Sequence, residues 1–562
     1  MKLKGSEALV QSLVDCGVEV IFGIPGGQMI PIYDALYGRT DIKNILMRHE
    51  QGAAHAADGY ARATGKIGVC FATSGPGATN LVTGIATANM DSIPMLAVTG
   101  QVGTAALGKD AFQEVDITGV TMPITKHSYL VKKAEDLPRV VSEAIYIATT
   151  GRPGPVLIDI PSDVQRAVID YKPVKSVSIR SYIPIREATG DAEIEKAAKM
   201  INASKKPVIY AGGGVVSAGA SKELTEFAEK ANIYAAATLM GKGAISDKHP
   251  KCLGMPGMHG TVAANYAFRD CDLMIVCGAR FDDRITGKIY EFAKNAKIIH
   301  IDIDKAEQGK TIKPDLSVVS DCKTALKKLI PLVNAKPEGR WNKQLAAWKK
   351  EYAMKVPAEK DKLLPQYILA KLSEITKGNA IVVTDVGQHQ MFSALYTQSI
   401  KPRTFLSSGG FGTMGFGFPA AFGAQVGEPK ADVFAVVGDG GFQMTLQELA
   451  PAVEQKLPVK ILIFNNKYLG MVRQWQELFW NKHYSGVDIS AQPDFVKLAE
   501  SYGACGIMVD KPADVEKALK KSLAIKDKPV VIDFRIDPEE NVYPMIPAGM
   551  SVDDMLISKE DK

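Results

Sequence analysis

The sequence lacks paired cysteines and long apolar runs. Its seven cysteines in 562 residues show no CxxC spacing and occur mostly in apolar stretches. This pattern argues against a disulfide framework or a zinc site and predicts reduced thiols in a cytoplasmic protein. No apolar run reaches the length of a membrane span, and the first residues pass directly into a predicted helix without a signal or transit segment. We therefore expect no membrane association.

An excess of one charge is also absent. The 67 basic and 62 acidic residues leave a net charge of +5, and no basic tract stands out, so a nucleic-acid partner is not indicated. Repeats and low-complexity segments are missing as well. With 46% hydrophobic residues, the chain is too long for a single core, and about two to four domains are expected.

Short apolar segments alternate with helical patterns in three parts of the chain. Such alternation is typical of a parallel sheet with helices on both faces, so the predicted fold class is α/β, with three doubly wound parallel-sheet domains. The predicted strands are 18–23, 67–73, 95–99 and 155–159, then 207–211, 273–278 and 298–303, then 380–386, 432–437, 459–464 and 529–534. The predicted domains are 1–175, 190–340 and 360–550. Polar linkers are expected around 171–191 and 335–364, the second with an exposed helix near Trp341 and Trp348.

Two apolar segments of the third domain end in residues suited to a metal ion. Asp439 follows one segment and Asn466 follows the next. Parallel strands bind ligands at their carboxyl ends, and Mg²⁺ prefers few, hard oxygen ligands from protein. Gly438, Gly440 and Gly441 would let the backbone approach a diphosphate. A Gly-Asp-Gly sequence alone is more often an ordinary strand, turn and helix, but the second polar strand end favours a cofactor site.

Glu50 begins a helix predicted over residues 50–63. The helix dipole favours a carboxylate at that position, and composition alone indicates a surface glutamate. The alternative is a catalytic carboxylate, which needs a cofactor to act on. His55 and Asp58 on the same helix are interpreted as packing or surface groups.

The metal-binding pattern resembles the signature of thiamine diphosphate (ThDP) enzymes. Further motifs resemble the catalytic large subunit of acetohydroxyacid synthase, or acetolactate synthase, of the biosynthetic FAD-containing type. They occur in one order over nearly the whole chain, which makes the resemblance specific. The matching blocks are 23–27, 49–52, 74–80, 110–114, 151–156, 257–260, 280–287, 300–304, 386–391, 415–419, 469–475 and 544–547.

The resemblance implies ThDP, Mg²⁺ and FAD as cofactors. Mg²⁺ would be held by Asp439, Asn466 and the backbone carbonyl of Tyr468. Glu50 would hydrogen-bond the aminopyrimidine ring of ThDP and promote loss of the cofactor's reactive proton. Met414 would brace the cofactor between its rings, although a buried Met is otherwise a gap-filler. The other residues implied to contact ThDP are Val386, Gly387, Gln388, His389, Gly412, Gly438, Gly440, Gly441, Gly470 and Met471.

The middle domain would bind FAD. Three glycines, 212–214, follow a predicted strand as in a dinucleotide-binding turn, but they do not complete a GxGxxG motif and are weak evidence alone. The residues implied to contact FAD are Arg152, Gly212, Gly213, Gly214, Thr238, Leu239, Met258, His259, Gly260, Thr261, Gly278, Arg280, Asp282, Asp302, Ile303, Ser320 and Asp321.

The reaction pocket would include Gly27, Gln113 and Arg284. The Gln113 amide would donate to a developing oxyanion, unless it is a surface loop amide. The Arg284 guanidinium would bind a substrate carboxylate in a bidentate manner, unless it serves only an ion pair with Asp283. Aromatic and apolar walls of the pocket are expected from Phe112, Val472 and Trp475, which core packing would explain equally well one by one.

The implied reaction is a carboligation. Pyruvate loses CO₂, and its two-carbon unit passes to a second pyruvate to give 2-acetolactate, or to 2-oxobutyrate to give 2-aceto-2-hydroxybutyrate. This is the first common step of branched-chain amino acid biosynthesis. The alternatives are a pyruvate oxidase-like enzyme with the same cofactors, or a catalytically silent regulatory or scaffold paralogue.

The resemblance also implies a homodimer or tetramer and leaves a small regulatory subunit open. In the family's arrangement the first and third domains of two chains face each other. Because Glu50 and Asp439 belong to these different domains, the resemblance implies that a dimer is the smallest active unit. Three positions depart from the family's usual pattern, at Gly103, Gln28 and Ser162. They fall near the entrance channel of the family and concern inhibitor response and substrate preference.

Overall fold

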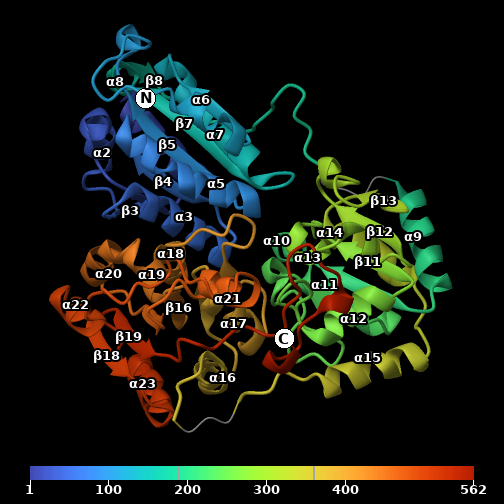
Figure 1. Cartoon of the computed structure of the whole chain (residues 1–562). Helices are drawn as coiled ribbons and strands as arrows, with labels where there is room; N and C mark the ends of the chain where they lie inside the picture. Colours follow the sequence, from blue (N-terminus) through green and yellow to red (C-terminus); the bar gives the residue numbers. More distant parts are fainter. Residues whose placement is uncertain (186–189, 358–360, 562) are drawn as a thin grey trace.

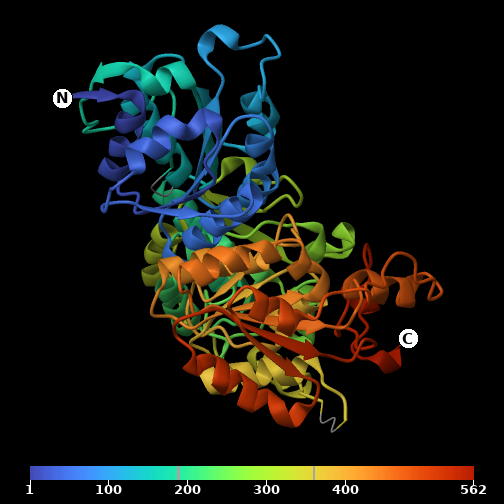
Figure 2. The same ribbon diagram turned by 90° about the vertical axis from the view of Figure 1, so that its left-hand side faces the viewer.

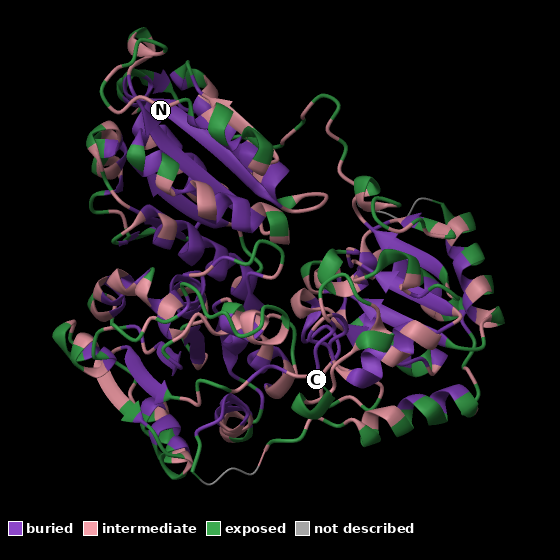
Figure 3. Ribbon diagram, viewed as in Figure 1, coloured by how far each residue is buried: buried purple, intermediate pink, exposed green. Residues whose placement is uncertain are grey.

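The computed structural model describes residues 1–185, 190–357 and 361–561, and three parallel sheets organise it (Figure 1). Each sheet is built from a separate stretch of chain and carries helices on both faces, which confirms the predicted fold class. The central strands form the buried centre of each unit (Figure 3). The expected domain boundaries stay predictions, and one of them, residue 360, lies outside the described residues.

The first sheet has six parallel strands in the order β3-β2-β4-β5-β7-β6. They are β2 (Val20–Gly23), β3 (Lys43–Leu46), β4 (Gly68–Ala72), β5 (Met95–Gln101), β6 (His127–Leu130) and β7 (Pro155–Pro161). The surrounding helices are α1 (Gly5–Asp15), α2 (Ile30–Leu36), α3 (Glu50–Thr64), α4 (Pro76–Asn80), α5 (Val82–Asp91), α6 (Ile117–Thr121), α7 (Leu137–Thr149) and α8 (Ser162–Arg166). A two-stranded antiparallel ribbon joins β1 (Lys2–Lys4) to β8 (Val168–Asp170).

Strand β5 shows why this sheet is covered on both faces. Side chains alternate along a strand, so neighbouring residues point to opposite sides. Met95 and Ala97 belong to one buried cluster, whereas Leu96 and Val98 belong to another. The sheet therefore lies between two apolar layers, as its continuous apolar strands predict.

The middle sheet has five parallel strands in the order β10-β9-β11-β12-β13. They are β9 (Pro207–Ala211), β10 (Ala235–Ala237), β11 (Leu273–Cys277), β12 (Lys297–Asp302) and β13 (Leu316–Val319). Its helices are α9 (Asp191–Ala203), α10 (Gly213–Ser217), α11 (Ser221–Ala231), α12 (Val262–Asp270), α13 (Asp283–Thr286), α14 (Cys322–Leu329) and α15 (Arg340–Glu351).

Helix α15 corrects one expectation. It was expected to be exposed, but Trp341 and Leu345 are buried against the middle domain. The indole N–H of Trp341 donates to the carbonyl of Pro207 at 3.1 Å. Lys343 and Lys350 lie on its exposed face, so the charged residues hid an amphipathic pattern in the sequence.

The third sheet has six parallel strands in the order β15-β14-β16-β17-β19-β18. They are β14 (Ile381–Thr384), β15 (Phe405–Ser407), β16 (Val433–Gly438), β17 (Lys460–Asn465), β18 (Cys505–Val509) and β19 (Val530–Arg535). Its helices are α16 (Pro365–Thr376), α17 (Gln388–Tyr396), α18 (Gly417–Gly427), α19 (Asp439–Gln443), α20 (Leu449–Glu454), α21 (Gly470–Phe479), α22 (Phe495–Ser501) and α23 (Pro512–Ala524).

The first and third sheets share one topology, strand for strand. Helix α3 connects β3 to β4, and α18 connects β15 to β16, so the two helices occupy equivalent places. They also pack against each other (Figure 1). The approach is close because a Cβ on Gly59 would overlap the carbonyl of Ala420, and one on Gly423 would overlap the carbonyl of Ala56. Glycine is thus required at both positions.

A buried ion cluster lies where the three domains meet. Arg62 pairs with Asp58 and with Asp91, at 2.9 Å in the second case, and donates to the carbonyl of Ser407 at 2.8 Å. Asp91 in turn accepts the backbone N–H of Gly410 at 2.8 Å. A Cβ on Gly410 would lie 2.9 Å from the Arg280 guanidinium of the middle domain. This junction anchors the loop that leads from β15 to α18.

The chain after β19 leaves the third domain and reaches the middle domain (Figures 1 and 2). The N–H of Ile546 donates to the carbonyl of Met258 at 2.8 Å. All seven cysteines are free, and all but Cys16 and Cys505 are buried, as predicted. Among the described residues, no helix combines the length and apolarity needed to cross a bilayer.

Candidate active site

Three neighbouring strands of the third sheet, β14, β16 and β17, end at one edge. Asp439 directly follows β16, and Asn466 directly follows β17. The Asp439 side chain is 1% exposed, and its Oδ2 accepts the backbone N–H of Lys467 at 2.9 Å. Burial raises the pKa of Asp439 to about 7, because a charged carboxylate is disfavoured away from water.

The oxygen atoms at this edge fit Mg²⁺. Asn466 Oδ1 accepts the N–H of Tyr468 at 3.0 Å across a turn in which Lys467 has a φ of 62°. A carboxylate, an amide oxygen and a main-chain carbonyl are the hard donors that this ion binds. In the described part of the chain, no three His, Cys, Asp or Glu side chains form a metal-binding group. Only one of the three predicted Mg²⁺ ligands, Asp439, is a side chain of these types. The result therefore does not conflict with the predicted site.

Glycines keep the same edge free of side chains. A Cβ on Gly438 would lie 3.0 Å from the His389 ring, and one on Gly387 would lie 2.9 Å from it. Gly387 has a φ of 149°, where other residues are strained. Gly440 lies near Met414, whose Cε would be 3.9 Å from a Cβ at that position. The structure therefore brings these five predicted ThDP residues together.

Gln388 joins this edge to helix α21 and to the chain after β19. Its Nε2 donates to Gln474 Oε1 at 2.8 Å and to the carbonyl of Glu540 at 3.0 Å. A Cβ on Gly470 would overlap the Gln388 amide. Burial lowers the pKa of the adjacent His389 to about 3, so its imidazole is neutral at physiological pH.

Asp385 is a site residue that the sequence pattern did not single out. It is fully buried and accepts N–H groups from Val386 at 2.7 Å and from Gly415 at 3.0 Å. A Cβ on Gly441 would lie 2.7 Å from its Oδ1, and burial raises its pKa to about 6. The sequence feature that could have revealed Asp385 is its position directly after an apolar strand, the same feature that identified Asp439. The other predicted ThDP residues in the loop that Asp385 binds are Gly412 and Met414.

Glu50 is buried in the first domain. Its side chain is 9% exposed, and its Oε2 accepts the side-chain N–H of Asn80 at 2.9 Å. A Cβ on Gly77 would lie 3.2 Å from its Oε1. The interpretation as a surface glutamate is therefore wrong. His55 and Asp58 on the same helix are fully buried packing groups and not surface groups.

The predicted pocket residues of the first domain lie around the turn at residues 74–77. A Cβ on Gly75 would lie 2.9 Å from the carbonyl of Gln113, which has a φ of 60°. Glu114 closes this loop by accepting the N–H of Ala111 at 3.0 Å. Phe112 is 85% exposed, so it forms no wall within one chain. Gly27 is also exposed, with no atom within 4 Å of a Cβ position.

Glu50 and Asp439 belong to different domains of the chain. Glu50 begins α3 beside the first sheet, and Asp439 begins α19 beside the third. The proposed base and the proposed metal ligand therefore come from two different domains.

The predicted FAD residues gather at the carboxyl ends of the middle strands. Gly212 follows β9, Gly278 follows β11, Asp302 ends β12 and Ser320 follows β13. The N–H of Gly214 donates to the Gly278 carbonyl at 2.9 Å, and a Cβ on Gly212 would overlap that carbonyl. Asp302 Oδ1 accepts a backbone N–H two residues later at 2.8 Å, and burial raises its pKa to about 6. Closely packed glycines and a carboxylate at the ends of parallel strands fit the binding of a dinucleotide.

Other predicted FAD residues have structural partners. Arg152 reaches from the first domain and pairs with Asp304 at 3.1 Å and with Glu307 at 2.7 Å. Arg280 Nη1 lies 3.5 Å from the sulfur of Met90. The residues whose side chains accept a backbone N–H at a helix start are Thr238, Thr261, Asp282 and Asp321. The remaining predicted FAD residues are neighbours of these in the sequence: Gly213, Leu239, Met258, His259, Gly260 and Ile303.

His259 is buried without a good partner. The Pro544 carbonyl lies near its ring, but neither ring nitrogen makes a hydrogen bond of normal geometry with a described residue. Burial lowers the pKa of His259 to about 4, and the opposite effect of the Pro544 carbonyl is smaller. A buried polar group of this kind is costly unless a ligand satisfies it, which fits a cofactor contact.

Arg284 lies beside a cavity of about 220 Å³ between the middle domain and the end of the chain. Its guanidinium stands 5.7 Å from the centre of the Trp475 ring, and its Nε is 3.8 Å from Asp283 Oδ2. Both members of that ion pair are more than half exposed, so the pair contributes little. Trp475 comes from helix α21, whose Met471 packs against the core of the third domain and whose Val472 is half-exposed.

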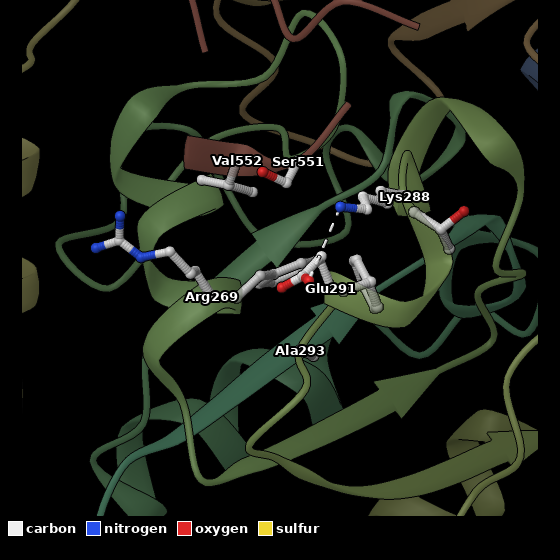
Figure 4. Close-up of a pocket in the computed structure, with 9 residues that line it drawn as sticks. Arg269, Lys288, Glu291, Ala293, Ser551 and Val552 are labelled. Atoms are coloured by element: carbon white, nitrogen blue, oxygen red, sulfur yellow. Dashed lines mark ion pairs between the residues drawn. The ribbon is translucent and has the colours of Figure 1, made fainter. Parts of the chain in front are cut away.

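A second cavity lies next to the first and is too small for a substrate. It measures about 20 Å³, room for about one water molecule. Arg269, Lys288, Ser551 and Val552 surround it, and Lys288 lies 3.9 Å from Glu291 (Figure 4).

The three departures from the family pattern lie around helix α8. A Cβ on Gly103 would lie 3.7 Å from Ser162 Oγ. Gln165, on the same helix as Ser162, donates to the carbonyl of Gln28 at 2.7 Å. The three positions therefore form one local surface.

Comparisons with family models and with known proteins identify one protein family. The models described as "Thiamine pyrophosphate enzyme" match with an N-terminal TPP binding domain at residues 3–120, a central domain at 194–329 and a C-terminal TPP binding domain at 385–534. "Acetolactate synthase" of Mycobacterium bovis is 48% identical, over 99% of this chain and 91% of the relative. The chain belongs to the acetolactate synthase family.

Two further acetolactate synthases support this assignment. "Probable acetolactate synthase large subunit" of Methanocaldococcus jannaschii is 49% identical over 97% of this chain and 94% of its own length. "Acetolactate synthase isozyme 3 large subunit" of Escherichia coli is 44% identical over 100% and 99%. The resemblance seen in the sequence motifs is confirmed, and ThDP, another name for thiamine pyrophosphate, is the cofactor of the matched domains.

Proposed function

We propose that this chain is the catalytic large subunit of an acetolactate synthase. It forms 2-acetolactate from two pyruvate molecules, or 2-aceto-2-hydroxybutyrate from pyruvate and 2-oxobutyrate, with ThDP, Mg²⁺ and FAD as cofactors. One observation carries the proposal: Asp439 and Asn466 converge on a glycine-lined sheet edge in a chain similar to acetolactate synthases over almost its whole length.

The residues have distinct proposed roles. Asp439, Asn466 and the Tyr468 carbonyl hold Mg²⁺, which in turn binds diphosphate. Bound ThDP supplies a carbon nucleophile that adds to 2-oxo acids and accepts the charge left by CO₂. Glu50 exchanges a proton with the aminopyrimidine ring, and its burial excludes water from that step. Arg284 orients a substrate carboxylate at the cavity.

We further propose that two copies of the chain form each active site. The support is the position of Glu50 and Asp439 in different domains and the exposure of Phe112 on the loop that would face the cofactor. A second copy would bring its Glu50 to this chain's Asp439, and a twofold axis would repeat the site. A tetramer, a small regulatory subunit and a cytoplasmic location are compatible proposals, the last supported by the free thiols.

A product assay with the purified full-length chain tests the proposed function. The protein is incubated with pyruvate, ThDP, Mg²⁺ and FAD, with and without 2-oxobutyrate, while dissolved oxygen is recorded. We expect 2-acetolactate alone in the first case, both acetohydroxy acids in the second, and no oxygen uptake. Oxygen uptake with acetate or acetyl phosphate as product would identify an oxidase. Failure to bind ThDP would identify a silent paralogue.

A further inference from the structure

Glu448 of the third domain contacts the backbone that leads into Glu50. It ends the short 3-10 helix η9 (Leu446–Glu448) and is fully buried. Its two carboxylate oxygens accept the N–H groups of Arg48 at 3.1 Å and of His49 at 3.0 Å. These residues immediately precede Glu50, and His49 caps helix α3. One carboxylate from a distant part of the chain thus fixes the start of that helix.

Gly52 leaves the space that this carboxylate fills. A Cβ at this position would overlap Glu448 Oε1, so any larger residue would displace the carboxylate. The backbone of Gly52 does not require glycine, because its φ is not positive. The contact with Glu448 therefore explains why the motif His49–Gly52 ends in glycine. A role for Glu50 alone would not explain it.

The charges around Glu448 couple it to Glu50. Burial, with a smaller contribution from the nearby Glu50 carboxylate, raises the pKa of Glu448 to about 7. Arg48 and the two N–H groups act in the opposite direction. Arg48 also pairs at its guanidinium with Glu454 at 3.1 Å, on the exposed side of the same contact.

We propose that Glu448, whose carboxylate fits the space left by Gly52, is a positioning residue for Glu50. Through two backbone hydrogen bonds, the third domain sets the direction in which the first domain of the same chain presents Glu50 to the cofactor. This inference rests on the proposed function of Glu50. Small displacements of a catalytic group cost large factors in rate, so the contact should affect turnover more than binding.

The test compares Glu448→Gln with the matched control Glu454→Gln in the holoenzyme. The Gln amide keeps the size of the side chain but turns an N–H donor toward a backbone N–H, so one bond is lost. We expect kcat to fall about tenfold or more while pyruvate KM and ThDP affinity change less than about twofold. The deuterium exchange of the reactive ThDP proton should slow by the same factor. Glu454→Gln should behave like the wild type.

A double-mutant cycle separates positioning from general damage. If Glu448 acts through Glu50, Glu448→Gln should cause little further loss in a Glu50→Gln protein, which by itself should lose about a hundredfold in kcat. Losses that multiply, an unchanged kcat, or failure of both Glu448→Gln and Glu448→Asp to fold would overturn the proposal. A wild-type protein that forms no acetohydroxy acid would reject the proposed function and this inference together.

Discussion

Three buried carboxylates of the third domain share one arrangement. Asp385, Asp439 and Glu448 each accept backbone N–H groups, and in the described residues none of them forms an ion pair with Lys or Arg. Backbone donors hold a carboxylate in place without neutralising it, so burial still raises all three pKa values. Such a carboxylate stays available to a cation or a proton.

Replacing Asp439 by Ala should abolish Mg²⁺-dependent retention of ThDP. The metal would keep only Asn466 and one carbonyl from the protein, so we expect ThDP affinity to fall about a hundredfold or more. Calorimetric titration with ThDP and Mg²⁺ measures this loss. The exposed Asp514 on α23 provides a control of the same chemistry. An unchanged affinity in Asp439→Ala would place the metal elsewhere.

Replacing Arg284 by Ala should weaken substrate use and leave cofactor binding intact. The change removes a charge-assisted contact to a carboxylate at the cavity, and kcat/KM for pyruvate should fall by about tenfold to a hundredfold. Steady-state kinetics at saturating cofactors measure it, with the exposed neighbour Lys288→Ala as control. If pyruvate saturation is unaltered, Arg284 serves only Asp283 and Trp475.

Site residues could be predicted from the sequence where they directly follow an apolar strand. Asp439 and Asn466 follow apolar segments, so their position at the sheet edge was readable. Glu448 was not, because its partners are backbone groups about 400 residues earlier in the chain. The burial of Glu50 also depends on remote contacts, which explains why composition favoured a surface glutamate.

At the scale of elements, helices α3 and α18 determine how the two ThDP domains meet. Their shared place in two sheets of one topology sets them face to face. Small residues, Gly59 and Gly423 among them, bring the backbones together. The Ala-rich sequence 50–63 predicted a close-packed helix, but not its partner.

Replacing Gly423 by Ala should destabilise this helix pair. The new methyl group would overlap the backbone carbonyl of Ala56, and a backbone atom cannot rotate away as a side chain can. Overpacking of this kind costs about 1–3 kcal/mol, so we expect a lower melting temperature in scanning calorimetry. Gly339→Ala is the control, since its nearest atom would be 3.9 Å from the Cβ. Equal melting of the two variants would contradict the packing argument.

Edge strands were the elements that the sequence pattern did not reveal. The short strands β3, β6, β10, β13, β15 and β18 have no predicted counterpart, whereas the central strands were predicted within a few residues. A central strand is buried on both faces and reads as a continuous apolar run. An edge strand such as β3, Lys-Asn-Ile-Leu, buries only Ile45 and gives no such run.

At the scale of the whole molecule, the ion cluster of Arg62 and Asp91 links the three domains. It connects the first domain to the loop before α18, and that loop lies close to Arg280 of the middle domain. The chain therefore offers a packed path from the middle domain to the loop beside the ThDP edge. We expect the proposed FAD to act through this path as a structural cofactor.

Removal of FAD should lower thermal stability as well as activity. A ligand that binds only the folded state stabilises it by mass action, and Arg280, one of the proposed FAD residues, lies at the domain junction. Carboligation has no net oxidation, so a redox-inert 5-deaza flavin should restore both the melting temperature and most acetolactate formation. Calorimetry and product analysis under anaerobic conditions measure the two effects. Activity that stops when the flavin is reduced would contradict this role.

The position of Glu50 and Asp439 in different domains of the chain has a genetic consequence. If a partner copy completes each site, two inactive alleles, Glu50→Gln and Asp439→Ala, should complement each other in one cell. A mixed dimer contains one site with both defects and one with neither. Random pairing of equal amounts then gives about a quarter of the wild-type sites, although each allele alone gives almost none. Recovery of growth without branched-chain amino acids would reveal it, and a chain that completes its own site would show no recovery.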